Sequence, residues 1–157
     1  MPCLWLQHDN SQLFVNVGII DASAISFAAL PATMPALQMF RALVDTGAQK
    51  TMITPNVATA LKLQAQGQIQ VLGVGGVTWH NWYLFHVAFT IPFLPHGQPP
   101  PPPGQPVALP IAAHVNPNVI AGGELPLSHG FDVLLGMDIL SSGSLKIEGN
   151  GQASFSF

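Results

Sequence analysis

The most constraining feature of this sequence is a carboxylate placed directly after an apolar run. Asp45 follows residues 42–44 (Ala-Leu-Val) and precedes Thr46 and Gly47. Such a run, closed by a polar residue and a glycine, is typical of a buried strand that turns sharply into a loop. Taken alone, an Asp-Thr-Gly triplet most often caps a tight turn. The triplet therefore predicts a strand end, and any function must be argued from further residues.

The rest of the chain has the pattern of an all-β protein. Gly and Pro contribute 15 residues each, and short segments rich in branched and aromatic residues lie between them. Two short helices are expected, one over 55–63 with Thr54 as its N-cap and Pro55 at its first position, and one over 136–140. The expected strands are 13–20, 38–44, 69–72, 78–89, 111–115, 131–135, 144–148 and 153–157.

The length of the chain fits one domain covering 1–157. Residues 95–106 read PHGQPPPPPGQP, which favours polyproline II and lacks most of the N–H donors that a sheet ladder needs. Because strand-like sequence continues on both sides, this segment is expected to be a surface loop within the domain. A proline-rich ligand for a partner domain is the less favoured interpretation. The sequence shows no internal repeat.

Charge argues against several functions. Only 7% of the residues are charged and the formal net charge is −3, so the clustered cations that bind nucleic acid are absent. Because so few residues are charged, the surface is expected to be unusually apolar, and an apolar surface favours self-association. With Cys3 as the sole cysteine, a disulfide framework or a multi-thiolate zinc site is excluded. We find neither a signal peptide nor an apolar run long enough for a membrane span, and expect a cytoplasmic protein with no membrane or nucleic-acid partner.

A second motif lies near the C-terminus, in Leu134-Leu135-Gly136-Met137-Asp138. Together with Asp45-Thr46-Gly47-Ala48, it resembles the motif pair of the retropepsin-like aspartic proteases. The resemblance implies a homodimeric, closed β-barrel or sandwich with one or two short helices, in which the apolar strand crosses beneath the aspartate loop. It also implies that Asp45 is catalytic, that Thr46 hydrogen-bonds across the dimer and that Gly47 admits substrate.

Two positions favour a particular branch of that family. Viral members commonly carry an acidic residue at the position of Gln49 and an arginine at that of Met137, and the two pair. Both residues of that ion pair are replaced here. In this respect the chain resembles the DNA-damage-inducible-type and bacterial single-domain aspartyl proteases. Ala48 stands where pepsin-like enzymes have a serine, and the loss of that hydroxyl favours activity at mildly acidic pH.

A single Asp-Thr-Gly motif cannot complete the chemistry by itself. Peptide hydrolysis by this route needs one carboxylate to take a proton from water and another to protonate the scissile carbonyl. A twofold homodimer would place Asp45 beside its counterpart. Asp132 and Asp138 are rivals for the second carboxylate, but Asp138 is expected to make local backbone or cap hydrogen bonds. The terminal segment 153–157, paired with an N-terminal strand, is expected to form the sheet between protomers.

The stretch between the motifs holds a glycine cluster, Gly73-Val74-Gly75-Gly76, which predicts a hairpin that closes over the peptide as a flap. Trp79 and Trp82 lie on or beside it, either lining pockets or in the core. His80 and His86 would share a strand face, but no close ligand spacing supports a metal site.

We therefore expect an endopeptidase acting on peptide or protein substrates, with no metal or organic cofactor. The alternative is a catalytically silent dimeric β-domain that binds peptides or serves assembly. A protease of a mobile element or phage that trims its own precursor would differ in biology rather than chemistry.

Overall fold

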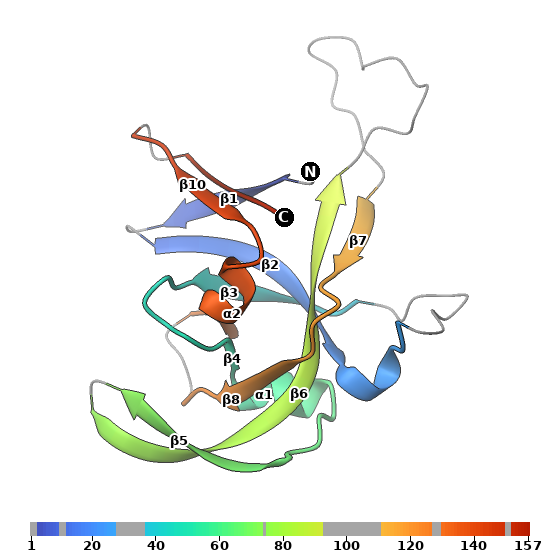
Figure 1. Cartoon of the computed structure of the whole chain (residues 1–157), viewed down its shortest axis with the longest axis vertical. Coiled ribbons are helices and arrows are strands. Elements are labelled where there is room, and N and C mark those ends of the chain that lie inside the picture. The colour runs from blue at the N-terminus through green and yellow to red at the C-terminus, as the bar shows by residue number, and fades with distance from the viewer. Residues whose placement is uncertain are drawn as a thin grey trace.

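The structure, a computed structural model, describes residues 3–9, 12–27, 37–73, 75–92, 111–126, 130–149 and 152–157. It is mostly β, with two short α-helices and one 3-10 turn in the described residues (Figure 1). The strands are β1 (Cys3–Asp9), β2 (Gln12–Asp21), β3 (Met39–Val44), β4 (Met52–Ile53), β5 (Gly67–Gly73), β6 (Gly76–Pro92), β7 (Ile111–Val115), β8 (Ile120–Glu124), β9 (Val133–Leu135), β10 (Ser144–Ile147) and β11 (Ala153–Ser156). The helical segments are η1 (Ala22–Ala24), α1 (Pro55–Ala60) and α2 (Met137–Leu140).

Every expected strand is present, β1 is the N-terminal strand expected beside 153–157, and β4 and β8 come in addition. β8 contains Gly122 and Gly123, which weaken a strand signal in a sequence. The structure explains Gly122, since a Cβ there would lie 2.5 Å from the Phe85 ring and 2.8 Å from the Thr51 carbonyl oxygen. The glycine is thus required by packing.

The first helix is shorter than expected. It begins at Pro55, as predicted, and Thr54 occupies the N-cap position, but the Thr54 side chain makes no capping hydrogen bond. Lys62 adopts a φ of 54°, which is not helical, and Leu63 N–H returns to the Ala58 carbonyl at 2.9 Å. The chain therefore leaves the helix before residue 63.

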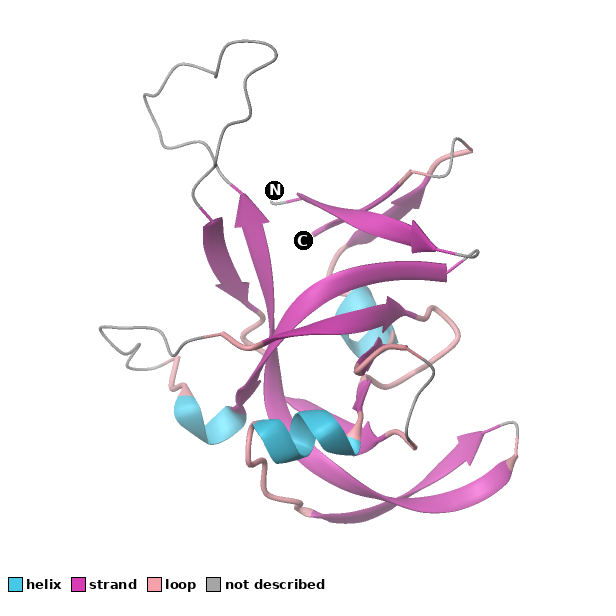
Figure 2. Ribbon diagram, turned by 180° about the vertical axis from the view of Figure 1, so that it is seen from behind, coloured by secondary structure: helices cyan, strands magenta, loops and turns pink. Residues whose placement is uncertain are grey.

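The central strands are joined in a circuit of pairings. β2 pairs with β3, β3 runs parallel to β9, β9 pairs with β4, β4 runs parallel to β8, and β8 and β2 both pair with the long β6. β6 also carries β5 at its start and β7 at its end. Figure 2 shows β6 curving through the whole molecule from the β5 hairpin to β7.

One large hydrophobic core fills this arrangement. Its fully buried side chains come from strands and helices that are distant in sequence, among them Val17, Ile53, Val57, Phe85, Val133 and Ile139. Because α1 and α2 both contribute to this core, they are held against the strands that flank Asp45. The aspartate loop thus rests on packed side chains.

The terminal strands form a three-stranded layer within one chain. β11 pairs antiparallel with β1 on one side and with β10 on the other. The expected pairing of an N-terminal strand with 153–157 is therefore present, but inside the protomer. The expectation that β11 joins the partner's strands is wrong, because both of its edges are already occupied. β10 is left at the end of the sheet order.

None of the helices in the described part of the chain is long and apolar enough to span a membrane. The proline-rich segment 95–106 lies outside the described residues.

Candidate active site

Asp45 stands immediately after the last residue of β3. β3 and β9 run in parallel, with Leu43 opposite Leu134 and Val44 opposite Leu135. Asp45 N–H then donates to the Leu135 carbonyl at 3.0 Å, extending the ladder by one bond. The two motifs are therefore direct neighbours, and the carboxylate emerges where the strand ends.

The loop after Asp45 turns back on the carboxylate. Gly47 N–H donates to Asp45 Oδ1 at 2.8 Å, and Ala48 N–H donates to the Asp45 carbonyl at 3.3 Å. A donor to the carboxylate fixes its orientation. Thr46 is exposed at the tip, and its hydroxyl makes no hydrogen bond with the described residues.

Backbone hydrogen bonds tie this loop to the start of α2. Met137 N–H donates to the Ala48 carbonyl at 2.8 Å, and Asp138 N–H to the Gln49 carbonyl at 3.3 Å. Gln49 and Met137 are thus brought next to each other, and the connection is made by peptide groups at and beside these two residues.

Asp138 anchors the far end of the same loop. Its carboxylate accepts from the Thr51 backbone N–H at 2.9 and 3.0 Å and from the Thr51 hydroxyl at 2.7 Å. The Thr51 hydroxyl oxygen in turn accepts from Gly136 N–H at 3.1 Å. The expectation of local bonds for Asp138 is wrong, since Thr51 lies 87 residues away. With its lone pairs engaged there, Asp138 serves the loop and is no second carboxylate for Asp45.

Gly136 permits the close approach that this network requires. A Cβ at residue 136 would lie 2.5 Å from the carbonyl carbon and 2.6 Å from the oxygen of Lys50. Both contacts are with backbone atoms, which cannot rotate away. The motif glycine is therefore needed where α2 begins against the aspartate loop.

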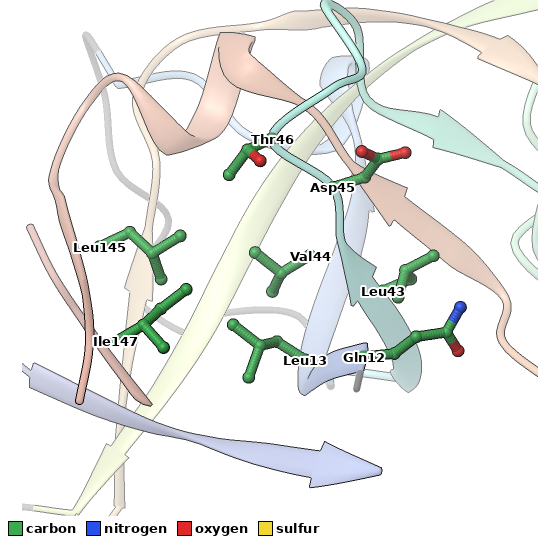
Figure 3. A pocket seen from close by; sticks show the side chains of 8 residues that line it. All are labelled: Gln12, Leu13, Leu43, Val44, Asp45, Thr46, Leu145 and Ile147. Atoms are coloured by element: carbon green, nitrogen blue, oxygen red, sulfur yellow. The ribbon is translucent and has the colours of Figure 1, made fainter. Parts of the chain in front are cut away.

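A cavity of about 300 Å³ opens beside Asp45. Figure 3 shows Leu13 and Val44 pointing toward Leu145 and Ile147 of β10 across it, with Asp45 and Thr46 at one end. Ile147 is 63% exposed although it is apolar. This space therefore lies between the end of β3, which carries Asp45, and uncovered apolar surface.

A larger cavity of about 500 Å³ lies on the other side of the loop, between residues 47–50 and 52 and strand residues 69–72 and 123. β5 and β6 form the expected hairpin, with Gly73 opposite Gly76 and Gly76 at a φ of 103°. Gly75 lies in its turn, and Val74 lies outside the described residues. Strand β5 of this hairpin thus lines the cavity on one side, and the loop from Gly47 onward lines it on the other.

The two faces of this hairpin differ. Ile69 and Val71 point inward, since both lie within 4 Å of where a Gly123 side chain would begin. Trp79 pairs with Gln70 on the opposite face and is 63% exposed. Neither Trp79 nor Trp82 is among the residues that line the two cavities beside the aspartate loop.

The histidines are dispersed. His86 is buried and its ring shares a 3.1 Å contact with the Asn116 carbonyl, while His80 contacts the Thr78 hydroxyl at 2.6 Å. His96 and His129 lie outside the described residues. Among the residues that are described, no group of three or more His, Cys, Asp or Glu could hold a metal.

Below the larger cavity, a carboxylate is held by two side chains of β6. The Tyr83 hydroxyl donates to Glu124 Oε2 at 2.5 Å, and Asn81 Nδ2 donates to the same oxygen at 3.4 Å. Burial and the neighbouring Glu124 raise the pKa of Tyr83 to about 12, so its hydroxyl stays protonated and donates. Glu124 is thereby bound into the scaffold next to Gly123.

Comparison with known proteins agrees with this geometry. A family model described as aspartyl protease matches residues 36–88, about a third of the chain, which include Asp45 and the hairpin. A solved retropepsin-like aspartic protease from Rickettsia conorii superposes with a TM-score of 0.51 over 98% of this chain and 89% of that one, at 14% identity. The fold is retropepsin-like. A search of curated proteins finds no match.

The retropepsin-like fold accounts for most positions that the motifs indicated, but sequence reasoning missed Thr51, Leu13, Leu145 and Ile147. Thr51 and Asp138 are joined only by the fold, and nothing in either local sequence indicates the pair. The β10 residues were assigned to a strand, but the contact of that strand with the aspartate loop depends on tertiary structure.

Replacing Asp138 with Asn tests the anchor of the loop. The amide would keep one acceptor but present an NH₂ group near the Thr51 N–H, so we expect a loss of about 2 kcal/mol in unfolding free energy. Chemical denaturation would measure it. Asp132→Asn is the matched control, because the Asp132 side chain makes no hydrogen bond with the described residues, and it should change stability by at most ~0.5 kcal/mol. Equal effects would contradict the assignment.

Gly136→Ala tests the close approach of α2 to the loop. The added methyl would overlap the Lys50 backbone, and we expect a destabilisation of about 2–3 kcal/mol. Gly149→Ala provides the control, since a Cβ there meets nothing within 4 Å. Thermal unfolding of both variants would decide, and a wild-type transition temperature for Gly136→Ala would refute the steric argument.

Proposed function

We propose that this chain is an aspartic endopeptidase in which Asp45 and the Asp45 of a second copy activate a water molecule. The observation that carries the proposal is the Asp45 carboxylate at the end of β3, oriented by Gly47 N–H and flanked by two cavities. The aspartyl protease match over this segment and the retropepsin-like fold support it.

The proposed reaction balances protons between two carboxylates. One ionised Asp45 takes a proton from water as the water oxygen attacks the scissile carbonyl carbon, and the protonated partner gives its proton to the carbonyl oxygen. In the tetrahedral diol the carboxylate that is now ionised takes a proton from one hydroxyl as the C–N bond breaks, and the other carboxyl gives its proton to the nitrogen, so the products are an acid and an amine and the dyad again holds one proton. Gly47 N–H keeps one carboxylate aligned throughout, because its bond is made before substrate binds.

A second copy is required, because neither rival within the chain is placed to supply the other carboxylate. Asp138 is engaged with Thr51, and Asp132 lies beside Arg41, at the opposite end of the β3–β9 pairing from Asp45. We infer that the partner covers the side of the molecule that bears β10, the loop after β3 and the β5–β6 hairpin. In Figure 1 all three lie on the left, and in Figure 2 all three lie on the right. The exposed Ile147 and the apolar cavity beside Asp45 lie on this side.

The backbone of β10 offers the means of pairing. Glu148 N–H donates to the Gln152 carbonyl at 2.8 Å, which makes 148 and 152 a hydrogen-bonded pair. In an antiparallel ladder such pairs alternate, so the N–H and C=O groups of Leu145 and Ile147 face away from β11. We propose that they pair with β10 of the second copy, beside the two Asp45 loops. An exposed strand edge of this kind is a ready template for pairing.

Two finer features belong to the same proposal. The β5–β6 hairpin acts as a flap that excludes water from bound peptide, with its inward residues Ile69 and Val71 against the substrate. The residue types Gln49 and Met137, which replace the acidic residue and the arginine common in viral members, support placement in the cellular branch of DNA-damage-inducible-type and bacterial enzymes.

Asp45→Asn tests the chemistry. We expect it to reduce cleavage of a mixed peptide library by at least about 10³-fold between roughly pH 4 and 7, because an amide can neither accept nor share the proton. A statine-type inhibitor should block the wild type. Asp21→Asn is the control, since Asp21 only caps the exposed η1 turn. Equal cleavage by Asp45→Asn would end the proposal. Peptide binding without any cleavage by the wild type would favour the silent β-domain instead.

Ile147→Pro tests the β10 edge. Proline removes an N–H that faces away from β11, so the hydrogen bonds between β10 and β11 are kept. The proposed pairing between two copies loses two hydrogen bonds, one from each copy. We expect the dimer dissociation constant to rise at least about ten-fold. Ile147→Val keeps the N–H and should leave it near the wild-type value. Analytical ultracentrifugation would measure both, and an unchanged dimer for a folded Ile147→Pro would exclude β10 as the interface.

A further inference from the structure

The larger cavity has apolar walls and one charge. Its volume of about 500 Å³ is within the range of sites that hold ligand groups. Met52 Cε and Ile69 Cδ1 come within 3.3 Å of where a Gly123 side chain would begin, and Val71 Cγ2 within 3.9 Å, so these three side chains converge at its floor. The neutral polar residues of the lining are Gln49 and Gln70, and its ionisable residue is Lys50.

The Lys50 backbone is held in place, while its side chain is exposed and its charge has no partner among the described residues. Its backbone packs against Gly136, where no Cβ fits. Two other cations of the chain are paired, Arg41 with Asp9 at 3.0 Å and Lys146 with Glu148 at 2.7 Å. Within the described residues the Lys50 side chain makes no ion pair or hydrogen bond. The Lys50 ammonium, exposed and without an ion-pair partner among the described residues, is therefore open to a ligand of opposite charge at the apolar cavity.

We infer that this cavity is a specificity subsite that takes a glutamate side chain of the peptide substrate, with Lys50 as the residue that recognises it. The inference rests on the proposed peptidase function. The cavity begins at Gly47, whose N–H contacts the Asp45 carboxylate, so it receives a side chain close to the scissile bond.

The chemistry of the walls selects glutamate among acidic residues. Its two methylene groups reach the apolar floor formed by Met52, Ile69 and Val71 while the carboxylate meets the ammonium near the exposed rim. Aspartate is one methylene shorter and loses part of that contact. The Asp45 pair that shares one proton carries a negative charge nearby, which repels an acidic side chain. Lys50 offsets that repulsion and makes the charged substrate acceptable.

The experiment compares peptides that are identical except for Glu or Gln at positions flanking the scissile bond. With wild-type protein we expect kcat/KM to favour one Glu position by roughly three- to ten-fold, as for a partly exposed charge pair. Lys50→Met should remove the preference, and Lys50→Glu should shift it toward lysine at the same position. Raising the salt concentration from about 0.05 to 0.5 M should weaken the wild-type preference.

Lys62→Met is the matched control, because Lys62 is exposed and lies outside the cavity lining. This variant should prefer the Glu peptide over the Gln peptide by the same factor as the wild type. Cleavage with the same Glu preference in wild type and Lys50→Met would overturn the subsite and leave the peptidase standing. If nothing is cleaved, the peptidase proposal fails, and fluorescence polarisation of the same labelled peptides on Asp45→Asn judges the subsite. The subsite is supported if Asp45→Asn binds the Glu peptide more tightly than the Gln peptide and if adding Lys50→Met abolishes that difference. Equal binding of the two peptides overturns it.

Discussion

The Asp138 carboxylate and Thr51 form the interaction on which the rest of the site depends. Three contacts of 2.7 to 3.0 Å join them, and the Thr51 hydroxyl accepts from Gly136 N–H as well. A charged acceptor with several donors makes strong hydrogen bonds. These bonds fix the Thr51 end of segment 45–51 to the start of α2. The other end is fixed on β9, where Asp45 N–H donates to the Leu135 carbonyl.

This frame orients one carboxylate and leaves the site incomplete. Asp138 is engaged with Thr51, and the cavity beside Asp45 is bounded on one side by the apolar Leu145 and Ile147 of β10, which pairs with β11 alone among the described strands. A twofold partner on that edge would add the second Asp45, cover the apolar side chains and pair the free N–H and C=O groups in one step. The catalytic requirement and the unsatisfied surface thus point to the same side of the molecule.

The sequence predicted what depends on local pattern. The apolar runs before Asp45 and before Gly136 predicted two strands, and the structure makes them parallel neighbours. What depends on contacts between distant segments was missed. Thr51 and Asp138 are 87 residues apart, and the glycines of β8 concealed a strand whose close packing on Phe85 requires Gly122. The alternation in 153–157 indicated a strand correctly, but alternation does not say which chain provides its neighbours.

The most direct test of the shared site mixes wild-type chains with Asp45→Asn chains and lets them exchange. If each site needs one Asp45 from each copy, only wild-type pairs are active, and an equal mixture should retain about a quarter of the activity of wild type at the same total concentration. The account predicts that activity falls as the square of the wild-type fraction. Activity of about one half, falling in proportion to the wild-type fraction, would show that a single chain carries a complete site and would contradict the account.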